Sequence, residues 1–324
     1  MSVIMVRNLK RDYETSLGII KRDKKIINAI RDISFEVERG EIFGLLGPNG
    51  AGKTSTIKIL TTLLAPTSGQ AVVLGHNCFG EEKELRRKIN FIFGGERSLY
   101  WRLSAYDNLS YFCDLYHVPE RVKKDRIEKL LDMVGLGDKA QYKVETFSKG
   151  MKQRLQIARG LVNDPEVLFL DEPTIGLDPV GAKTLRKIIK QLSSEGKTIL
   201  LTTHYMQEAD ELCDRIAIIN KGKLFALNTS EKLKENIDSS VIEVEIHTLK
   251  EDTLLRLNNI EHVTGVDVIP NDVGYKLKID CRNPRKIMSL INDQLSENNV
   301  KSILMREATL EDVYLKIIGG DYSA

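Results

Sequence analysis

Two stretches of the sequence contain residue types that act together on phosphates. The first, at 47–54, reads Gly-Pro-Asn-Gly-Ala-Gly-Lys-Thr and lies between an apolar run of strand length at 41–46 and a segment with helical spacing at 54–64. A phosphate-binding loop requires this context, because backbone N–H groups and the positive end of the following helix surround the phosphates. The sequence therefore predicts a site for a nucleoside triphosphate.

Two side chains of this loop have expected chemical tasks. Lys53 reaches the β- and γ-phosphate oxygens, and the Thr54 hydroxyl is a ligand for Mg²⁺. The glycines at 47, 50 and 52 allow tight turns with positive φ. The alternative is a glycine-rich turn that only joins a strand to a helix, and the lysine and threonine at these positions argue against it.

The second stretch ends in two adjacent carboxylates. Residues 167–170 are continuously apolar, as is typical of a parallel strand buried on both faces, and Asp171 and Glu172 follow directly. Successive side chains of a strand point to opposite faces, so the two carboxylates can do different work. We expect Asp171 to hold Mg²⁺ through a water and Glu172 to act as general base on the attacking water. A plain acidic turn after a strand is the alternative.

Over residues 3–230 the chain resembles the nucleotide-binding subunit of an ATP-binding cassette (ABC) transporter. Residues 147–154, Phe-Ser-Lys-Gly-Met-Lys-Gln-Arg, are similar to the family signature, which is usually written Leu-Ser-Gly-Gly-Gln. The resemblance implies that Ser148 and Gly150 bind the γ-phosphate of ATP held by a second subunit. A serine hydroxyl and the backbone N–H groups that open the following helix are suited to this task.

The resemblance extends to three further positions. Residues 174–179, which include Asp178, are similar to the D-loop that crosses the dimer interface, and His204 matches the switch histidine for the γ-phosphate. Taken alone, a histidine after an apolar strand at 198–203 is more often an ordinary strand-end residue. Tyr13 resembles the aromatic residue that stacks on adenine, although a core tyrosine fits the same pattern.

Together these arguments define the expected site. The catalytic residues are expected to be Glu172, His204 and Lys53. Those that bind ATP are expected to be Tyr13, Gly47, Pro48, Asn49, Gly50, Ala51, Gly52, Lys53, Thr54 and Ser55. The residues that act on ATP across the dimer are expected to be Ser148, Gly150 and Asp178, and the Mg²⁺ ligands Thr54 and Asp171.

One loop departs from the family pattern. Residues 91–97 read Phe-Ile-Phe-Gly-Gly-Glu-Arg, and Gly95 stands where the family usually has a glutamine that touches Mg²⁺ and relays the position of the membrane subunit. Two replacements stay open: water fills the place of the missing side chain, or Glu96 supplies an oxygen ligand. Water is favoured, because a further carboxylate beside phosphates is repelled.

A divided site couples ATP binding to dimer formation. One subunit surrounds only half of the γ-phosphate, so ATP binds the closed dimer better than the open one and shifts that equilibrium. Moving from a mostly open to a mostly closed dimer takes about 5.5 kcal/mol. Two ATP sites can supply this with a few charge-assisted hydrogen bonds of about 1.5 to 3 kcal/mol each.

Composition sets the class of protein. A net charge of +2, from 48 basic and 46 acidic residues, gives no overall field for nucleic acid, so we expect no nucleic-acid partner. The basic cluster at 21–25 is either a solvated loop or a membrane-surface contact. Four scattered cysteines indicate a reducing compartment and no structural zinc. We see no signal peptide and no run of 18 apolar residues, so we expect a soluble chain that cannot form a transport path.

The predicted fold class is α/β. Residues 1–235 are expected to form a P-loop ABC cassette with a mixed sheet and a helical subdomain at about 81–160. Its first strands are expected near 3–8 and 29–37, with an inserted loop at 14–25, and the pattern from 81 to 144 is helical and charged.

The segment 236–324 is expected to be a small α+β domain. Strands at 241–246, 263–269, 275–281 and 301–305, with helices at 251–258 and from Pro284, give the ferredoxin-like order β-α-β-β-α-β. Asn283 is expected to cap the second helix. Thr309 and Asp312 are expected to form a capping box that opens a final helix, which resembles the end of cassettes serving type-2 exporters. Its role is either that of a dimer-stabilising or docking appendage, which is favoured, or that of a ligand sensor.

The resemblance implies a partner in the membrane. In the family, a groove of the helical subdomain receives a short helix of the permease, and Tyr100, Trp101 and Arg102 are the candidates for this contact; the alternative is that the two aromatic residues are core.

The predicted function is therefore ATP hydrolysis that powers export through a separate permease. We expect a homodimer or a pair with a close relative, in the cytoplasm on the inner face of the membrane. The alternatives are a non-transport ABC ATPase of nucleic-acid repair or translation, or a switch that binds ATP and barely hydrolyses it. The cargo is left open.

Overall fold

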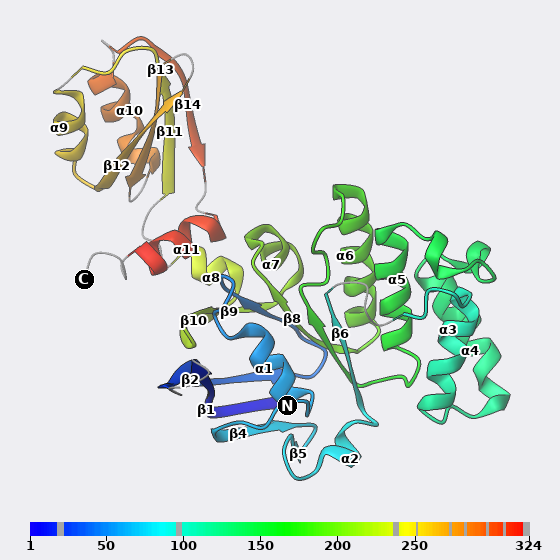
Figure 1. Cartoon of the computed structure of the whole chain (residues 1–324). Helices are drawn as coiled ribbons and strands as arrows, with labels where there is room; N and C mark the ends of the chain where they lie inside the picture. Colours follow the sequence, from blue (N-terminus) through cyan, green and yellow to red (C-terminus); the bar gives the residue numbers. More distant parts are fainter. Residues whose placement is uncertain are drawn as a thin grey trace. The chain divides into compact units, whose positions relative to one another are not determined.

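A computed structural model describes residues 1–17, 23–94, 99–235, 240–250, 252–271, 274–281, 284–295, 298–306 and 309–319. The chain divides into two compact units, Met1–Thr229 and Ser230–Ala324, drawn in Figure 1. The division falls before the short helix α8 (Ser230–Glu235), earlier than the expected boundary after residue 235. Each unit is described by itself.

The first unit is built on a ten-stranded mixed sheet, in the order β5-β4-β1-β2-β10-β9-β3-β8-β7-β6. Strands β9, β3, β8, β7 and β6 run parallel, and β5, β4, β1 and β2 pair antiparallel. The bounds are β1 Ser2–Leu17, β2 Asp23–Glu38, β3 Ile42–Leu46, β4 Ser68–Val73, β5 His76–Asn77, β6 Ile89–Phe93, β7 Val167–Asp171, β8 Thr198–Thr203, β9 Arg215–Asn220 and β10 Lys223–Asn228.

The first two strands are longer than the sequence indicated. β1 continues to Leu17 and β2 begins at Asp23, with the two paired through Tyr13↔Ile27 to Leu17↔Asp23. The expected loop at 14–25 is therefore wrong at both ends, and residues 18–22 lie outside the described part of the chain. The sequence of 14–25 is mostly polar, so the apolar alternation that reveals a strand is missing from it.

The helices of the first unit include a separate helical group. α3, α4 and α5 pack on one another at one end of this unit (Figure 1). The bounds are α1 Lys53–Leu60, α2 Glu82–Leu85, α3 Ala105–Leu115, α4 Glu120–Met133, η1 Gly137–Lys139, η2 Val144–Thr146, α5 Lys149–Gly160, α6 Pro179–Ser194 and α7 Met206–Leu212. Among the described residues, no helix has the length and apolar character needed to cross a bilayer.

The expected helical pattern from residue 81 onward holds at α2 but is wrong at 89–93. Residues 89–93 form β6, which pairs parallel with β7 at the edge of the core sheet. The run Ile-Asn-Phe-Ile-Phe has the β-branched and aromatic residues typical of a strand, but the charged segments on either side conceal it. The helical group therefore follows a core strand and begins at α3.

The centre of the sheet explains where the predicted site residues meet. Every residue of β3, β7 and β8 is buried, which matches the apolar runs at their centres. These strands are neighbours and run parallel, so their carboxyl ends lie at one edge of the sheet. The phosphate loop follows β3, Glu172 follows β7 and His204 follows β8.

The second unit has the predicted element order. β11 (Ser240–Ile246), α9 (Thr253–Asn258), β12 (Val263–Asn271), β13 (Gly274–Cys281), α10 (Pro284–Leu295) and β14 (Val300–Arg306) form a four-stranded antiparallel sheet in the order β12-β13-β11-β14 with two helices. Alternate residues Ile242, Val244 and Ile246 share one apolar core with α9 and α10. The ferredoxin-like order is thus confirmed.

The last helix, α11 (Leu310–Gly319), begins at the predicted capping box. The Thr309 N–H donates to Asp312 Oδ2 at 2.8 Å, and the Asp312 N–H donates to Thr309 Oγ1 at 3.3 Å. This reciprocal pair confirms the cap. The expected cap at Asn283 lies outside the described residues.

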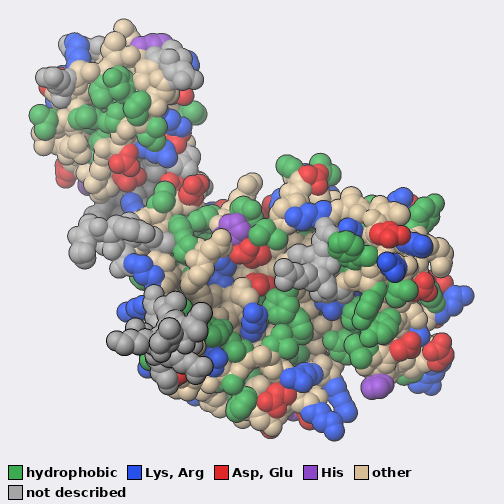
Figure 2. Space-filling model, in the orientation of Figure 1, with side chains coloured by type: hydrophobic (Ala, Val, Ile, Leu, Met, Phe, Trp, Pro, Cys, Tyr) green, Lys and Arg blue, Asp and Glu red, His purple; other side chains and the backbone are tan. Residues whose placement is uncertain are grey.

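Charge is spread over the surface. On the face in view in Figure 2, Lys and Arg side chains are interspersed with Asp and Glu, and no large region carries one sign alone. This agrees with the small net charge of +2. The distribution gives no extended basic surface on this face for a nucleic-acid backbone.

Candidate active site

The structure brings five predicted site residues to the carboxyl edge of the parallel strands. The Thr54 hydroxyl donates to Asp171, at 2.9 Å from Oδ2 and 3.1 Å from Oδ1. Lys53 Nζ lies 3.5 Å from Glu172 Oε1, and His204 Nδ1 lies 3.1 Å from the same oxygen. Residues from three separate parts of the sequence therefore form one cluster of acids, bases and hydroxyls.

The glycines of the loop serve two different needs. Gly50 and Gly52 have φ values of 81° and 106°, as expected for turns that favour glycine. Gly47 does not: a Cβ there would lie 2.1 Å from the carbonyl oxygen of Ile219 on β9. The predicted positive φ at Gly47 is therefore wrong, and this glycine is required because the loop passes so close to the neighbouring strand.

Lys53 is buried, with 4% of its surface exposed. Its ammonium group donates to the carbonyl oxygens of Gly47 at 2.7 Å and Pro48 at 3.1 Å. Burial lowers the pKa of Lys53, and the nearby Glu172 carboxylate opposes that shift. A positive charge held in a poorly solvated place acts more strongly on an anion than one in water.

A threonine that the sequence reasoning missed holds the Asp171 carboxylate and the Glu172 backbone. Thr202, at the buried end of β8, donates its hydroxyl to Asp171 Oδ1 at 2.6 Å, and its hydroxyl oxygen accepts from the Glu172 N–H at 3.1 Å. The Glu172 N–H also lies 3.1 Å from the Thr202 carbonyl oxygen. The signal was the polar pair Thr202 and Thr203 at the end of an otherwise apolar strand.

Glu172 takes its direction from a turn and not from strand alternation. β7 ends at Asp171, and Glu172 has φ 49°, in the left-handed region that costs a non-glycine residue about 1 to 3 kcal/mol. Asp171 points into the buried interior with 8% exposure. The two carboxylates have different partners, Thr54 and Thr202 for Asp171 and Lys53 and His204 for Glu172. The Thr202 hydrogen bonds to the Glu172 N–H hold this strained turn.

His204 lies beside the Glu172 carboxylate. The 3.1 Å contact between Nδ1 and Glu172 Oε1 is short, but Nδ1 does not have the angles of a hydrogen bond. The imidazole side chain is 27% exposed, and its ring centroid is 4.1 Å from that of Tyr205. The histidine can therefore reach both the carboxylate and a ligand at the open side of the cluster.

Comparisons with known proteins decide the family. Residues 30–175 match the family model described as ABC transporter. The linearmycin resistance ATP-binding protein LnrL of Bacillus subtilis is 34% identical over 320 residues, with 98% of each chain covered. The chain belongs to the ABC transporter family.

Other relatives of this ABC protein agree. A fluoroquinolones export ATP-binding protein of Mycobacterium tuberculosis is 39% identical over 293 residues, covering 90% of this chain and 88% of the relative. The dimeric, ADP- and phosphate-bound ATP-binding cassette MJ0796 superposes with a TM-score of 0.61 and 26% identity, covering 70% of this chain and 98% of that cassette. The P-loop fold class is confirmed, and the ABC protein binds and hydrolyses ATP.

The pair Thr54 and Asp171 fits Mg²⁺ in an ABC site. The metal usually takes one or two protein oxygen ligands and completes its shell with phosphate oxygens and water. A hydroxyl and a buried carboxylate 2.9 Å apart supply such ligands beside the phosphate loop. Within the described ranges no group of three or more His, Cys, Asp or Glu residues forms a metal cage of its own. A metal held jointly with ATP therefore suits these residues.

The ABC signature is built as an open turn. Ser148 begins α5, and its hydroxyl oxygen accepts from the Met151 N–H at 3.3 Å. A Cβ on Gly150 would meet no atom within 4 Å, so the backbone there is accessible. Among the described contacts, no hydrogen bond joins this turn to the phosphate loop of the same chain. Action on a second subunit's ATP stays a prediction.

The signature contains a lysine whose place the sequence reasoning did not consider. Lys149 stands between Ser148 and Gly150, and its Nζ would lie 2.1 Å from a Cβ at Gly176 in the D-loop turn. Gly176 has φ 67°, so the turn favours glycine for its conformation, whereas the flexible end of Lys149 could move away from a Cβ. Asp178, at the start of α6, is exposed, as its expected interface role requires.

Tyr13 lies next to the phosphate loop. Its hydroxyl is 3.2 Å from Ser55 Oγ, one residue after Thr54, and the Arg11 guanidinium lies 4.8 Å from the ring centroid. Tyr13 is half-buried, which leaves part of the ring accessible. Adenine stacking stays a prediction. Gly95, which stands in place of the family's glutamine, and Glu96 lie outside the described residues.

The docking candidates are on the surface. Tyr100 and Trp101 are 48% and 49% exposed, and Arg102 is exposed as well. The alternative that the two aromatic residues belong to the core is therefore wrong. Tyr100 packs edge-on against Tyr111 of α3, with ring centroids 4.9 Å apart.

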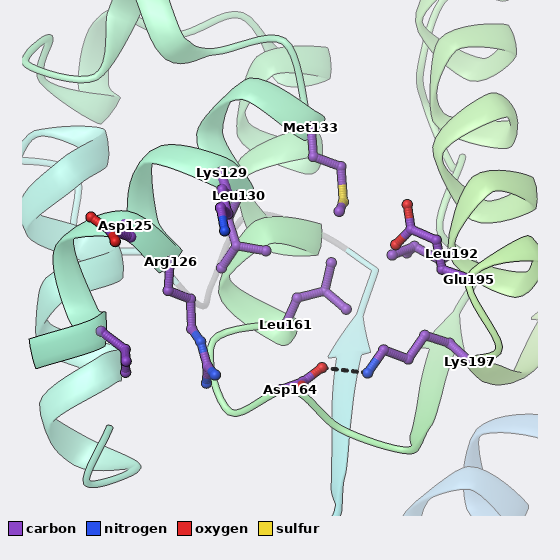
Figure 3. Close-up of a pocket in the computed structure, with 11 residues that line it drawn as sticks. Asp125, Arg126, Lys129, Leu130, Met133, Leu161, Asp164, Leu192, Glu195 and Lys197 are labelled. Atoms are coloured by element: carbon purple, nitrogen blue, oxygen red, sulfur yellow. Dashed lines mark hydrogen bonds and ion pairs between the residues drawn. The ribbon is translucent and has the colours of Figure 1, made fainter. Parts of the chain in front are cut away.

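A groove of about 410 Å³ lies elsewhere in the cassette (Figure 3). Residues of α4 line it, together with the ends of α5 and α6. Leu130, Leu161 and Leu192 contribute apolar surface, and the ion pair between Lys197 and Asp164 is part of its wall. No predicted site residue lines this groove, so its chemistry is separate from that of the phosphate loop.

Proposed function

We propose that this protein supplies the energy of ATP hydrolysis to an exporter whose membrane-spanning permease is a separate chain. The observation that carries the proposal is the cluster in which Lys53 and His204 both lie within 3.5 Å of Glu172 Oε1, beside the Thr54 and Asp171 pair. Relatives of nearly full length are named for linearmycin resistance and fluoroquinolones export. These names support export; the alternatives of nucleic-acid repair and translation gain nothing from them.

The proposed catalytic roles follow from the contacts. Thr54 and Asp171 would hold Mg²⁺, which would supply positive charge to the phosphates. Glu172 accepts a proton from the attacking water, and the strained turn at φ 49° orients its carboxylate. Lys53 and His204 stabilise the γ-phosphate charge from two sides.

The proposed assembly is a homodimer. Ser148 and Gly150 complete the ATP site of the other copy, and the exposed Asp178 lies at the interface. Support comes from the open signature turn and from the dimeric cassette to which the chain is similar. ATP then stabilises the closed dimer, and its hydrolysis removes the γ-phosphate that the signature binds. Through its contact with the permease, each dimer would lie on the inner face of the cell membrane.

The proposed permease contact is the exposed segment Tyr100, Trp101 and Arg102. Its backbone is tied to the residues that precede the signature: the Glu145 N–H donates to the Trp101 carbonyl oxygen at 2.9 Å, and the Val144 N–H donates to the Leu103 carbonyl oxygen at 3.0 Å. A movement of the permease at this segment is therefore passed to the signature turn without an intervening flexible loop.

Copurification tests the transport proposal. The tagged chain, isolated from its host membrane with ATP, is expected to bring one integral membrane protein of transporter type, identified by mass spectrometry. Trp101→Ala is expected to reduce that recovery about tenfold, since an exposed aromatic anchor at an interface is worth roughly 1.4 kcal/mol or more. Tyr142→Ala is the control, because Tyr142 is another exposed aromatic residue of the helical group. If the chain is isolated without any membrane protein, the transport proposal is contradicted. If Trp101→Ala recovers as much membrane protein as the parent, only the docking role of this segment is contradicted.

A further inference from the structure

A buried glutamate beside the active site is unused by the mechanism above. Glu208, in the first turn of α7, is only 3% exposed. Neither carboxylate oxygen has a hydrogen-bond partner in the described structure. Burial raises the pKa of this carboxyl. A buried polar group without a partner is costly, so its presence requires an explanation.

Two hydroxyls that act on this carboxyl come from the two catalytic loops. The hydroxyls of Thr203 and Thr174 lie within its reach and oppose the rise of its pKa, although neither has the geometry of a formed hydrogen bond. Thr203 Oγ1 already accepts from the Tyr205 N–H at 3.0 Å, so its own proton is available for an acceptor. Thr174 is 7% exposed, and water is therefore a poor alternative partner for its hydroxyl.

Each threonine is attached to one part of the machinery. Thr203 immediately precedes His204, and Thr174 lies in the turn in which the Ile175 N–H donates to the Glu172 carbonyl oxygen at 3.2 Å. The same turn continues into the D-loop. Glu208 therefore lies between the loop that carries the histidine and the turn that carries the proposed base.

We propose that Glu208 is a positioning residue that joins these two loops through the hydroxyls of Thr203 and Thr174. The inference rests on the roles proposed for Glu172 and His204. With Glu208 in place, the loops move together and keep Glu172 Oε1 and His204 Nδ1 at their 3.1 Å separation. Without it, each loop shifts separately, and a misplacement of about 1 Å in a catalytic group costs up to about 10²-fold in rate.

The kinetic test compares two replacements of Glu208. Glu208→Ala is expected to lower kcat about tenfold or more while KM for ATP changes less than about twofold, because the residue is buried on α7 and lies outside the phosphate loop. Glu208→Gln is expected to keep kcat within about threefold of the parent, since the amide has the same shape and bonds to both hydroxyls. Glu211→Gln is the matched control: it lies on the same helix, and its carboxylate pairs with Arg186 at 2.8 Å.

Two results would overturn the positioning role of Glu208. A folded Glu208→Ala variant with the parent kcat overturns the proposal, and so does a Glu208→Gln variant as slow as Glu208→Ala. If Glu208→Ala does not fold, a double-mutant cycle with Glu208→Leu and Thr174→Val decides, because leucine fills the space of the glutamate side chain but cannot accept from the threonine hydroxyl. Losses in kcat that are less than additive support the contact, and additive losses refute it.

A parallel variant separates the two proposals. Glu172→Gln measured in the same assay reports on the proposed base alone. Parent-rate hydrolysis by Glu172→Gln contradicts the catalytic role on which the inference rests. A slow Glu172→Gln together with parent-rate Glu208→Ala contradicts only the positioning role.

Discussion

The two units of the chain differ in whether they bury charged side chains. In the described part of Ser230–Ala324 the buried polar residues are Ser230, Thr253 and Asn298, and none is charged. In Met1–Thr229 the buried residues include five with ionisable side chains: Glu41, Lys53, Arg159, Asp171 and Glu208. Burial of charge is expensive, so this difference indicates which unit carries the chemistry.

The sheets explain the difference. The parallel strands β3, β7 and β8 are covered on both faces, so polar groups gather at their carboxyl ends, where loops meet. The antiparallel sheet of the second unit has only one face covered by α9 and α10. Its charges lie on the other face, as in the 2.8 Å ion pair between Lys276 and Glu243.

The largest expected effect concerns Glu172. Glu172→Gln is expected to lower ATP turnover about 10²-fold or more, because the general base is lost while the shape of the side chain is kept. An ATP-bound dimer is expected to accumulate, which size-exclusion chromatography with light scattering measures. Glu245→Gln is the control from the second unit, where Glu245 forms a surface pair with Lys301, and its turnover is expected to equal that of the parent. If the parent, Glu172→Gln and Glu245→Gln hydrolyse ATP at equal rates, Glu172 is not the general base.

Ser148 is expected to have the next largest effect. Ser148→Ala removes one charge-assisted hydrogen bond of about 1.5 to 3 kcal/mol from each ATP, so the ATP-dependent dimer is expected to weaken by about 10-fold or more. Binding of ATP to the isolated subunit is expected to be unchanged, because Lys53 and Thr54 are intact. Sedimentation of the Glu172→Gln background with and without Ser148→Ala measures the difference. An unchanged dimer would show that the signature does not act across an interface.

Removal of the second unit tests the comparison directly. A chain that ends at Thr229 is expected to fold and to retain ATP turnover within about threefold, because every group of the proposed site lies before that residue. The cassette MJ0796, which matches 70% of this chain over 98% of its own length, supports this expectation. A phosphate-release assay and a thermal melt check it. Loss of all turnover in a folded truncated chain would give the second unit a direct part in the chemistry.

The smallest expected effect is a pH dependence of stability. Burial raises the pKa of Glu208, so the folded state binds a proton more tightly than the unfolded state does. Between the ordinary pKa of glutamate, about 4.3, and the raised value, stability therefore falls as pH rises. Glu208→Gln cannot ionise and so lacks this pH dependence. The difference between its melting temperature and that of the parent is therefore expected to grow as pH rises over that window. The charged neighbours Arg186 and His204 are unchanged in both proteins. A difference that is constant with pH would show that Glu208 does not titrate in this way.

Prediction from the sequence worked best where local patterns carry the information. The phosphate loop, the buried strand before Asp171 and the capping box at Thr309 each depend on neighbouring residues, and the structure places each element as expected. The strand β6 and the long ribbon of β1 and β2 were missed or shortened, since flanking charges or exposed faces hide their period.

The sequence by itself determined which residue types stand after which strands, and hence a phosphate-binding site with two carboxylates and a histidine. Only the tertiary structure decided how they meet. The φ of 49° at Glu172, the bond from Thr202 to Asp171 and the burial of Glu208 all depend on strands β7 and β8 lying side by side. The physical reason is that hydrogen bonds and desolvation between residues far apart in the chain arise only when packing brings them together.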